Sequence, residues 1–367
     1  MMLRRRETFL FGAAVLVACS VALTAQKNDK KQDEIQAREI QSIDKLVDEA
    51  AAGQAAPNDL GVAWAHEDYM KAAKNTFVPF TLTIDPSKLA GPTTLTLYWR
   101  VVSKTAAAAA PPPPPAANQK KDDKKNAPPA KRDFPYEGIS TVSVASPTTP
   151  LRVSRSFDVP GGAYDVYVIV KEPSPATAPK TPPVLKASVI KQSVTVPDFW
   201  SGELSTSSVI VTQRIDPLPA PLTPQQQAER PYAMGSMELV PVVDMKFSKK
   251  SELSTLAFVY NPKLDGMNKP DVVVEYSFCQ IAAGSQPKAG EPCKAGEKFF
   301  NKTNPQNFNA QTLPPQWDAA AGHQVQTGQA VPLASFPEGE YRLEIKVTDK
   351  LANKSVTRDV NFSVAAS

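Results

Sequence analysis

Histidine and cysteine, the residues that most often bind metals or act in catalysis, are scarce in this sequence. It has two histidines and three cysteines among 367 residues. No HExxH, zinc-type cysteine spacing, GxSxG or P-loop motif occurs in it. We interpret His66, in "WAHEDYM", as part of a surface or helix-capping cluster. We therefore expect no catalytic residue, no cofactor and no metal, and a hydrolase is only a remote alternative.

A strong charge of one sign and long apolar runs are also lacking beyond the N-terminus. The net charge of +4 gives no reason to expect nucleic-acid binding. The chain begins "MMLRRRETFLFGAAVLVACSVALTAQ", in which three arginines precede an apolar run that is short for a membrane span. We predict a signal peptide at residues 1–25 and an exported protein, either periplasmic or extracellular.

Two modes of signal processing stay open. The segment "LVAC" resembles a bacterial lipobox, which would make Cys19 the acylated first residue. Cleavage after Ala25 is favoured, because the apolar run continues beyond Cys19. We expect contact with a membrane only if the chain is lipid-anchored through Cys19.

Glycine is scarce relative to proline, with 16 glycines against 36 prolines. Because proline is costly inside helices and central strands, we expect short elements joined by loops. Apolar residues recur at helical spacing in residues 31–52 and then alternate with a period of two from Thr76 onward. The sequence predicts an all-β fold preceded by one amphipathic helix.

We expect four parts along the chain. The signal peptide is followed by a helical and polar segment at 26–57. A first sandwich is predicted at 58–197, with a disordered insertion rich in Ala, Pro and Lys at 105–133. A second sandwich is predicted at 198–367. Its Pro-rich stretch 214–231 is either a loop of this sandwich, which we favour, or the linker between the two.

A repeated segment supports this division. "VPGGAYDVYVIVK" (159–171) and "FPEGEYRLEIKVTD" (336–349) share a Pro-x-Gly-x-Tyr start and then alternate apolar residues. A tyrosine whose ring leans on the core while its hydroxyl caps a loop is a recurrent feature of immunoglobulin-like sandwiches. The repeat predicts that each copy belongs to the closing hairpin of one such sandwich, and therefore two tandem sandwiches.

Several residues are candidates for a contact surface. In the first repeat Tyr167 and Ile169 occupy the face where the second repeat has Glu344 and Lys346. This face is either covered by the helix or by the second sandwich, or it forms a contact patch. Phe199 and Trp200 fall at the predicted junction. Trp317 packs in a loop or stacks on a sugar ring.

Only Cys279 and Cys293 remain after removal of the predicted signal peptide. Because exported proteins fold under oxidising conditions, we predict a disulfide between these two residues. It closes a short Gly- and Pro-rich loop and contributes about 3 kcal/mol to stability in the chain-entropy model.

Three segments, "VPDFWSGELSTSSVIV", "FNKTNPQNFNAQTLPP" and "FPEGEYRLEIKVTDKLANKSVTRDVNFSV", resemble exported bacterial proteins with paired immunoglobulin-like regions. The β-rich tails of some GWxTD-domain proteins are similar, although the GWxTD motif itself is absent. The resemblance covers most of residues 60–367. It implies a β-sandwich fold and an envelope location, and it carries over no catalytic residue.

We therefore expect a non-catalytic interaction or structural module of the bacterial envelope, which binds a protein partner through its sandwich surfaces. The alternative is a module that binds glycan or cell wall.

Overall fold

The computed structural model of the chain describes residues 36–89, 91, 93–105, 134–144, 151–175 and 185–366. The predicted signal peptide, the candidate lipidation residue Cys19 and nearly all of the predicted insertion 105–133 lie outside the described residues. Within the described part, no helix has the length and apolar character needed to cross a membrane.

The N-terminal half forms two four-stranded sheets that face each other. In one sheet β3 pairs with β1, β2 and β6, and the other has the order β5-β4-β7-β8. Their inner faces enclose one core, in which Phe80, Trp99 and Phe157 are in contact. The strands are β1 (Ala63–Glu67), β2 (Met70–Lys71), β3 (Thr76–Ile84), β4 (Thr93–Ser103), β5 (Tyr136–Val144), β6 (Leu151–Val159), β7 (Gly162–Lys171) and β8 (Ala187–Val196).

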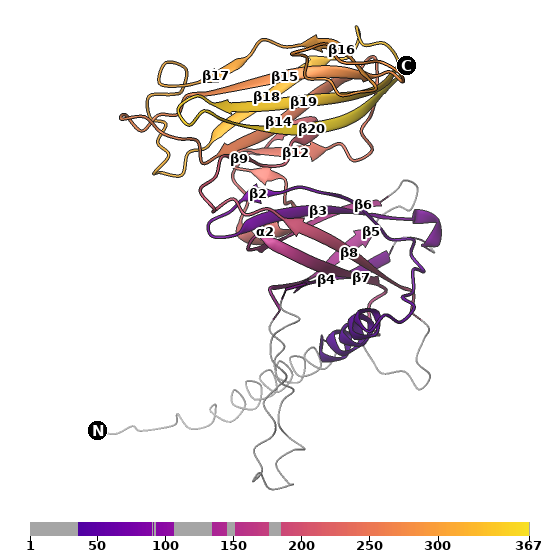
Figure 1. Cartoon of the computed structure of the whole chain (residues 1–367). Coiled ribbons are helices and arrows are strands. Elements are labelled where there is room, and N and C mark those ends of the chain that lie inside the picture. The colour runs from indigo at the N-terminus through magenta and orange to yellow at the C-terminus, as the bar shows by residue number, and fades with distance from the viewer. Residues whose placement is uncertain are drawn as a thin grey trace, which may run out of the picture.

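The C-terminal half forms two six-stranded sheets around a second core (Figure 1). One has the order β11-β12-β10-β14-β18 with β9 on β14, and the other has the order β13-β20-β19-β15-β16 with β17 on β15. The strands are β9 (Ser205–Thr206), β10 (Ile210–Pro217), β11 (Ala233–Met234), β12 (Met237–Pro241), β13 (Lys246–Ser248), β14 (Glu252–Tyr260), β15 (Val272–Ile281), β16 (Glu297–Lys302), β17 (Gln306–Phe308), β18 (Val325–Pro332), β19 (Gly339–Asp349) and β20 (Lys354–Ala365).

The fold is all-β with two immunoglobulin-like sandwiches, as the sequence predicts. Both repeats form the predicted tyrosine corner. The hydroxyl of Tyr164 donates to the carbonyl of Pro160 at 2.9 Å, and that of Tyr341 donates to the carbonyl of Pro337 at 2.8 Å. Both rings are buried in their cores, so each tyrosine ties the turn before its strand to the sandwich interior.

The Pro-rich stretch 214–231 lies within the second sandwich. Its first residues continue β10, and the rest connects β10 to β11 and β12 in the same sheet. It contains the short helix α2 (Pro224–Glu229), which begins with a capping box formed by Thr223 and Gln226. Because α2 lies against β6 of the first sandwich, this loop connects two strands of one sandwich and also contacts the other.

The N-terminal helix, described over residues 36–51, covers the outer face of the β5-β4-β7-β8 sheet (Figure 1). Ile43 and Val47 pack on Tyr98, Tyr167 and Ile169. Tyr167 is 6% exposed and Ile169 is 0% exposed. The alternative in which these two residues form a contact patch is therefore wrong, because the helix removes them from solvent.

Two buried cations of the sheet hold this helix. Arg100 pairs with Asp44 at 2.6 Å and Lys171 pairs with Glu39 at 2.7 Å. Burial by itself would raise the pKa of Glu39, but its hydrogen bonds to Lys171 and Ser174 outweigh burial and lower this pKa. The helix is thus docked through an apolar stripe with ion pairs beside it.

Candidate functional site

Tyr69 and the adjoining strand β2 attach the first sandwich to the second. The backbone N–H of Tyr69 donates to Ser208 Oγ at 2.9 Å, and the N–H of Ser208 donates to the carbonyl of Tyr69 at 2.9 Å. The N–H of Lys71 donates to the hydroxyl oxygen of Tyr260 at 3.1 Å. Residues 69–71 are therefore fixed to the second sandwich by hydrogen bonds of their own backbone.

The two sandwiches also share a small apolar cluster. Met70 of the first sandwich lies among Ile210, Tyr232, Leu239 and Leu256 of the second, and all five are buried. Burial of apolar surface contributes roughly 25 cal/mol per Å². The junction is therefore stabilised in the same way as a domain core, which opposes hinge motion between the sandwiches.

A buried carboxyl links the two halves at the edge of this cluster. Asp68 is 1% exposed, and its Oδ2 lies 3.0 Å from Nε2 of His66 and accepts the hydroxyl of Tyr232 at 2.9 Å. Burial by itself would lower the pKa of His66, but the hydrogen bond to Asp68 and the charges of Asp68 and Glu67 raise it. His66 lies in β1, so our interpretation of a surface or helix-capping cluster is wrong.

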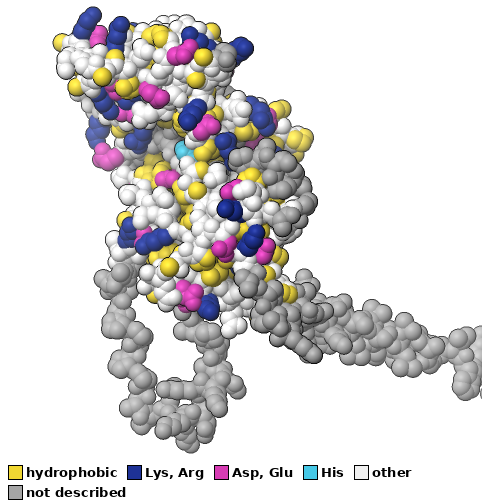
Figure 2. Space-filling view, turned by 90° about the vertical axis from the view of Figure 1, so that its right-hand side faces the viewer, with side chains coloured by type: hydrophobic (Ala, Val, Ile, Leu, Met, Phe, Trp, Pro, Cys, Tyr) yellow, Lys and Arg dark blue, Asp and Glu magenta, His cyan; other side chains and the backbone are white. Residues whose placement is uncertain are grey.

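A groove of about 610 Å³ lies at the junction and is lined by residues of both sandwiches, including Lys71, Trp200, Tyr260, Trp317 and His323. Figure 2 shows side chains of both charges spread over this face of both sandwiches. Volumes of about 300–1,000 Å³ are typical of sites for small ligands. This groove is our candidate functional site.

Trp200 is the exposed aromatic residue of the groove. It is 51% exposed, and its indole N–H donates to the carbonyl of Asn75 at 3.3 Å. Its backbone N–H donates to Oδ1 of Asp198 at 2.8 Å. Its ring and its backbone are both held, so the exposed part of the indole has a fixed orientation in the groove.

Lys71 lies beside this ring. Its Nζ is 4.1 Å from the centroid of the Trp200 ring and donates to Oδ1 of Asn261 at 2.9 Å. Burial lowers the pKa of Lys71, and the charge of Asp198 partly opposes this. Asn261 is itself held by the carbonyls of Phe199 and Glu203, to which its amide donates.

The other predicted contact residues are placed differently. Phe199 is 1% exposed and packs on Tyr260 with ring centroids 4.9 Å apart. Trp317 is 8% exposed, belongs to the core of the second sandwich and donates from its indole to the carbonyl of Gln324 at 3.3 Å. Phe199 supports the junction from inside, and Trp317 contributes only part of its ring to the groove. Lys71 and Asn261 carry no sequence signal that would have identified them.

Both histidines have hydrogen-bond partners among the described residues. Within the described ranges, Nε2 of His66 has Asp68 as its hydrogen-bond partner, and Nδ1 of His323 accepts the backbone N–H of Asp318 at 3.0 Å. No hydroxyl or thiol among these residues hydrogen-bonds to either ring.

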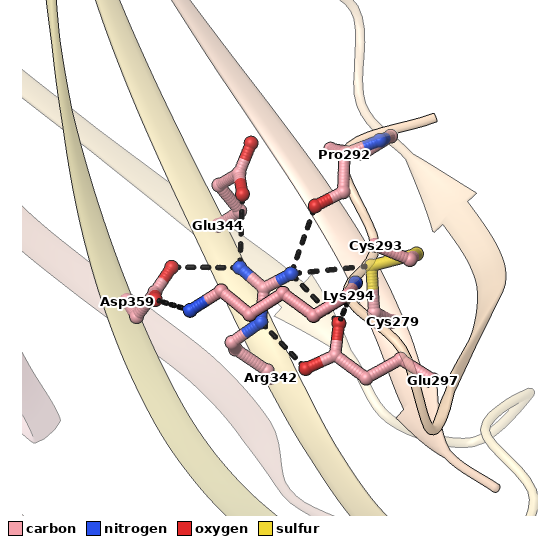
Figure 3. A network of polar contacts seen from close by, with 8 residues as sticks. All are labelled: Cys279, Pro292, Cys293, Lys294, Glu297, Arg342, Glu344 and Asp359. Carbon is pink, nitrogen blue, oxygen red and sulfur yellow. Dashed lines mark hydrogen bonds and ion pairs between the residues drawn. A yellow bond between two sulfur atoms is a disulfide. The ribbon is translucent and has the colours of Figure 1, made fainter. Parts of the chain in front are cut away.

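A second polar cluster lies on the outer face of β19 (Figure 3). Arg342 donates to both carboxylate oxygens of Glu297, at 2.8 and 2.7 Å, and to Glu344 and Asp359 at 2.9 and 2.7 Å. The alternation along β19 would place Arg342 in solvent, yet it is 3% exposed. The loop between β15 and β16 covers it, and Pro292 of this loop accepts a hydrogen bond from its guanidinium.

The predicted disulfide between Cys279 and Cys293 closes this loop. Ligand atoms of these two cysteines and Glu297 lie within 4.8 Å of one another. They do not form a metal site, because the sulfurs are bonded to each other and both oxygens of Glu297 accept hydrogen bonds from Arg342. This cluster has a structural role, because it fixes the loop between β15 and β16 to Arg342 of β19.

No protein-family model matches the chain, and no curated protein matches it. Solved structures with some similarity include Salmonella alpha-2-macroglobulin reacted with methylamine, with a TM-score of 0.27 and 10% identity over 83% of this chain and 24% of that chain. Trypsin-activated alpha-2-macroglobulin from Escherichia coli gives a TM-score of 0.21 and 10% identity over 85% of this chain and 17% of that chain. The chain spans a quarter or less of these proteins, and scores this low support no transfer of function.

Proposed function

We propose that the chain is a non-catalytic, exported binding module of the bacterial envelope that takes its ligand in the junction groove. The observation that carries this proposal is the position of the groove, between two sandwiches that share an apolar cluster and backbone hydrogen bonds. Such a groove keeps its shape without a ligand, and this lowers the entropic cost of binding.

The size of the groove bears on the kind of ligand. A stable contact with a globular protein buries about 800 Å² on each partner, on a broad and mostly flat surface. The groove is instead a concavity of about 610 Å³, in the range of small-ligand sites. We therefore favour the glycan alternative over a globular protein partner, with Trp200 as the stacking residue in place of Trp317.

Export is supported by the disulfide between Cys279 and Cys293, because such bonds persist in oxidising compartments. It is also supported by the arginine-led apolar segment at the N-terminus. Both features are compatible with a periplasmic or extracellular location.

Retention on native envelope material tests the proposal. The mature chain is mixed with envelope fractions and sedimented, and the bound fraction is compared with that of Trp200→Ala. We expect the variant to lose retention, because the exposed ring of the groove is gone. Ile139→Ala is the matched control, since Ile139 is also 51% exposed but lies on β5 outside the groove. Equal retention of Trp200→Ala and the wild type contradicts the proposal.

A further inference from the structure

The residues that line the junction groove include basic side chains but no acidic ones. Lys71 contributes a cation and His323 contributes an imidazole, and the lining contains no aspartate or glutamate. Asp198 acts on Lys71 through its charge, but it does not line the groove, and its Oδ1 accepts the backbone N–H of Trp200. The electrostatic character of the groove therefore favours an anionic ligand.

Lys71 has N–H donors that can bind such a ligand. An ammonium group has three N–H donors. One donates to Oδ1 of Asn261, and the group stands over the ring of Trp200. Across the described ranges Lys71 forms no ion pair with a carboxylate. A carboxylate on the ligand would add a charge-assisted hydrogen bond, which is stronger than a bond between neutral groups.

His323 supplies a second donor. Its Nδ1 accepts the backbone N–H of Asp318, so in the neutral ring the proton is on Nε2. Nε2 has no hydrogen-bond partner in the part of the chain that the structure describes. It is therefore available to a hydroxyl or carboxylate oxygen in the groove.

A second hollow lies next to the junction groove. It has a volume of about 480 Å³ and shares Trp317, His323 and Gln324 with the groove.

We propose that the junction groove binds an acidic oligosaccharide, in which a carboxylate pairs with Lys71 and the adjoining sugar ring packs on Trp200. This inference rests on the proposed function, because it assumes that the groove is the ligand site. The indole favours an acidic sugar over an acidic peptide. A pyranose ring has a flat C–H face that matches the held and half-exposed indole, whereas an Asp or Glu side chain has no ring to place there.

Titration calorimetry with uronate trimers tests this inference. Trimers of galacturonate and of mannuronate are compared with their methyl esters, which keep the sugar rings and remove the charge. We expect a trimer to bind at least about tenfold more tightly than its ester, the size expected for one charged hydrogen bond. Lys71→Gln should bind trimer and ester equally, and Trp200→Ala should bind neither.

Lys191→Gln is the matched control, because Lys191 also lies over an aromatic ring, 5.5 Å from that of Tyr167, but outside the groove. It should bind as the wild type does. Equal affinity for trimer and ester overturns the inference, and so does equally tight binding of a triglutamate peptide. If no trimer binds while Trp200→Ala still loses retention on envelope material, the acidic-sugar inference fails and the proposed function stands. If Trp200→Ala keeps that retention, the proposed function fails.

Discussion

The hydroxyl of Tyr341 donates to the carbonyl of Pro337 at 2.8 Å, and Tyr164 and Pro160 repeat this relationship in the first sandwich. In both cases the acceptor lies four residues before the tyrosine, and the ring is buried. The hydrogen bond closes the turn that leads into the strand, while the ring anchors it to the core. The two corners are therefore equivalent local structures that support two separate cores.

We predict that Tyr341→Phe lowers the free energy of unfolding by about 1 kcal/mol, because it removes this hydrogen bond and keeps the ring. Tyr164→Phe should have an effect of similar size in the first sandwich. Urea unfolding followed by circular dichroism measures both. Tyr136→Phe is the control, since the Tyr136 hydroxyl has no hydrogen-bond partner among the described residues. If Tyr136→Phe lowers the free energy of unfolding as much as Tyr341→Phe does, the hydrogen bond of the corner is not the cause of the loss in stability.

The docked helix gives a second prediction. Val47 is 1% exposed against the first sandwich, so Val47→Asp buries a charge or forces the helix away from the sheet, at a cost of about 2 kcal/mol or more. The released face would expose Tyr98, Tyr167 and Ile169. We expect faster proteolysis at the helix and increased binding of the dye ANS.

Lys45→Asp is the matched control, because Lys45 lies on the same helix with a side chain that is 75% exposed. It places an aspartate on the helix without touching the sheet. Wild-type protease resistance in Val47→Asp would mean that the helix is not held by its apolar stripe.

The Arg342 cluster gives a third prediction. The side chains of Arg342 and Glu297 are 4% and 8% exposed, so Arg342→Met leaves the carboxylate of Glu297 buried without its cation. We expect a loss of about 3–5 kcal/mol. Adding Glu297→Leu should recover most of this loss, because the unpaired charge is then gone. A double-mutant cycle in urea measures the coupling.

Lys346→Met serves as the control on the same outer face, since Lys346 is exposed and remains outside the cluster. It should change stability by less than about 0.5 kcal/mol. Additive effects of Arg342→Met and Glu297→Leu would argue against a specific pair.

The junction gives a prediction on pH. The pKa of His66 is raised in the folded state by its bond to Asp68, above the ordinary value of about 6.5. A group of this kind stabilises the fold fully below its unfolded pKa, and the contribution is lost as the pH rises through the folded pKa. We therefore expect thermal stability to fall as the pH rises above about 6.5.

His66→Gln should flatten this dependence. The carboxyl groups with lowered pKa, such as Glu39 and Glu297, act only when the pH falls below about 4.5, so they do not affect this range. Thermal melts at half-unit intervals provide the measurement. If the thermal stability of His66→Gln depends on pH as strongly as that of the wild type, His66 is not the source of this dependence.

Local patterns in the sequence were sufficient for the long strands and for the corners, but not for β1, where we expected His66 in a surface or helix-capping cluster. The alternation of apolar residues predicts the strands, and the Pro-x-Gly-x-Tyr start predicts both corners, because the contact joins residues only four positions apart. The disulfide follows from cysteine count alone, since only Cys279 and Cys293 remain after the predicted signal peptide. The helix was predicted from its spacing, while the surface that it covers stayed open between two alternatives.

Only the tertiary structure decided which side chains are exposed and which meet. Arg342 alternates outward along β19, but a distant loop buries it. Lys71 and Trp200 belong to separate segments, and they meet because residues 69–71 are hydrogen-bonded to the second sandwich. Sequence periodicity reports the face of a strand on which a residue lies, and it carries no information on what packs against that face. The physical reason is that periodicity is set by the backbone geometry of one element, whereas burial and the groove depend on contacts between elements far apart in the chain.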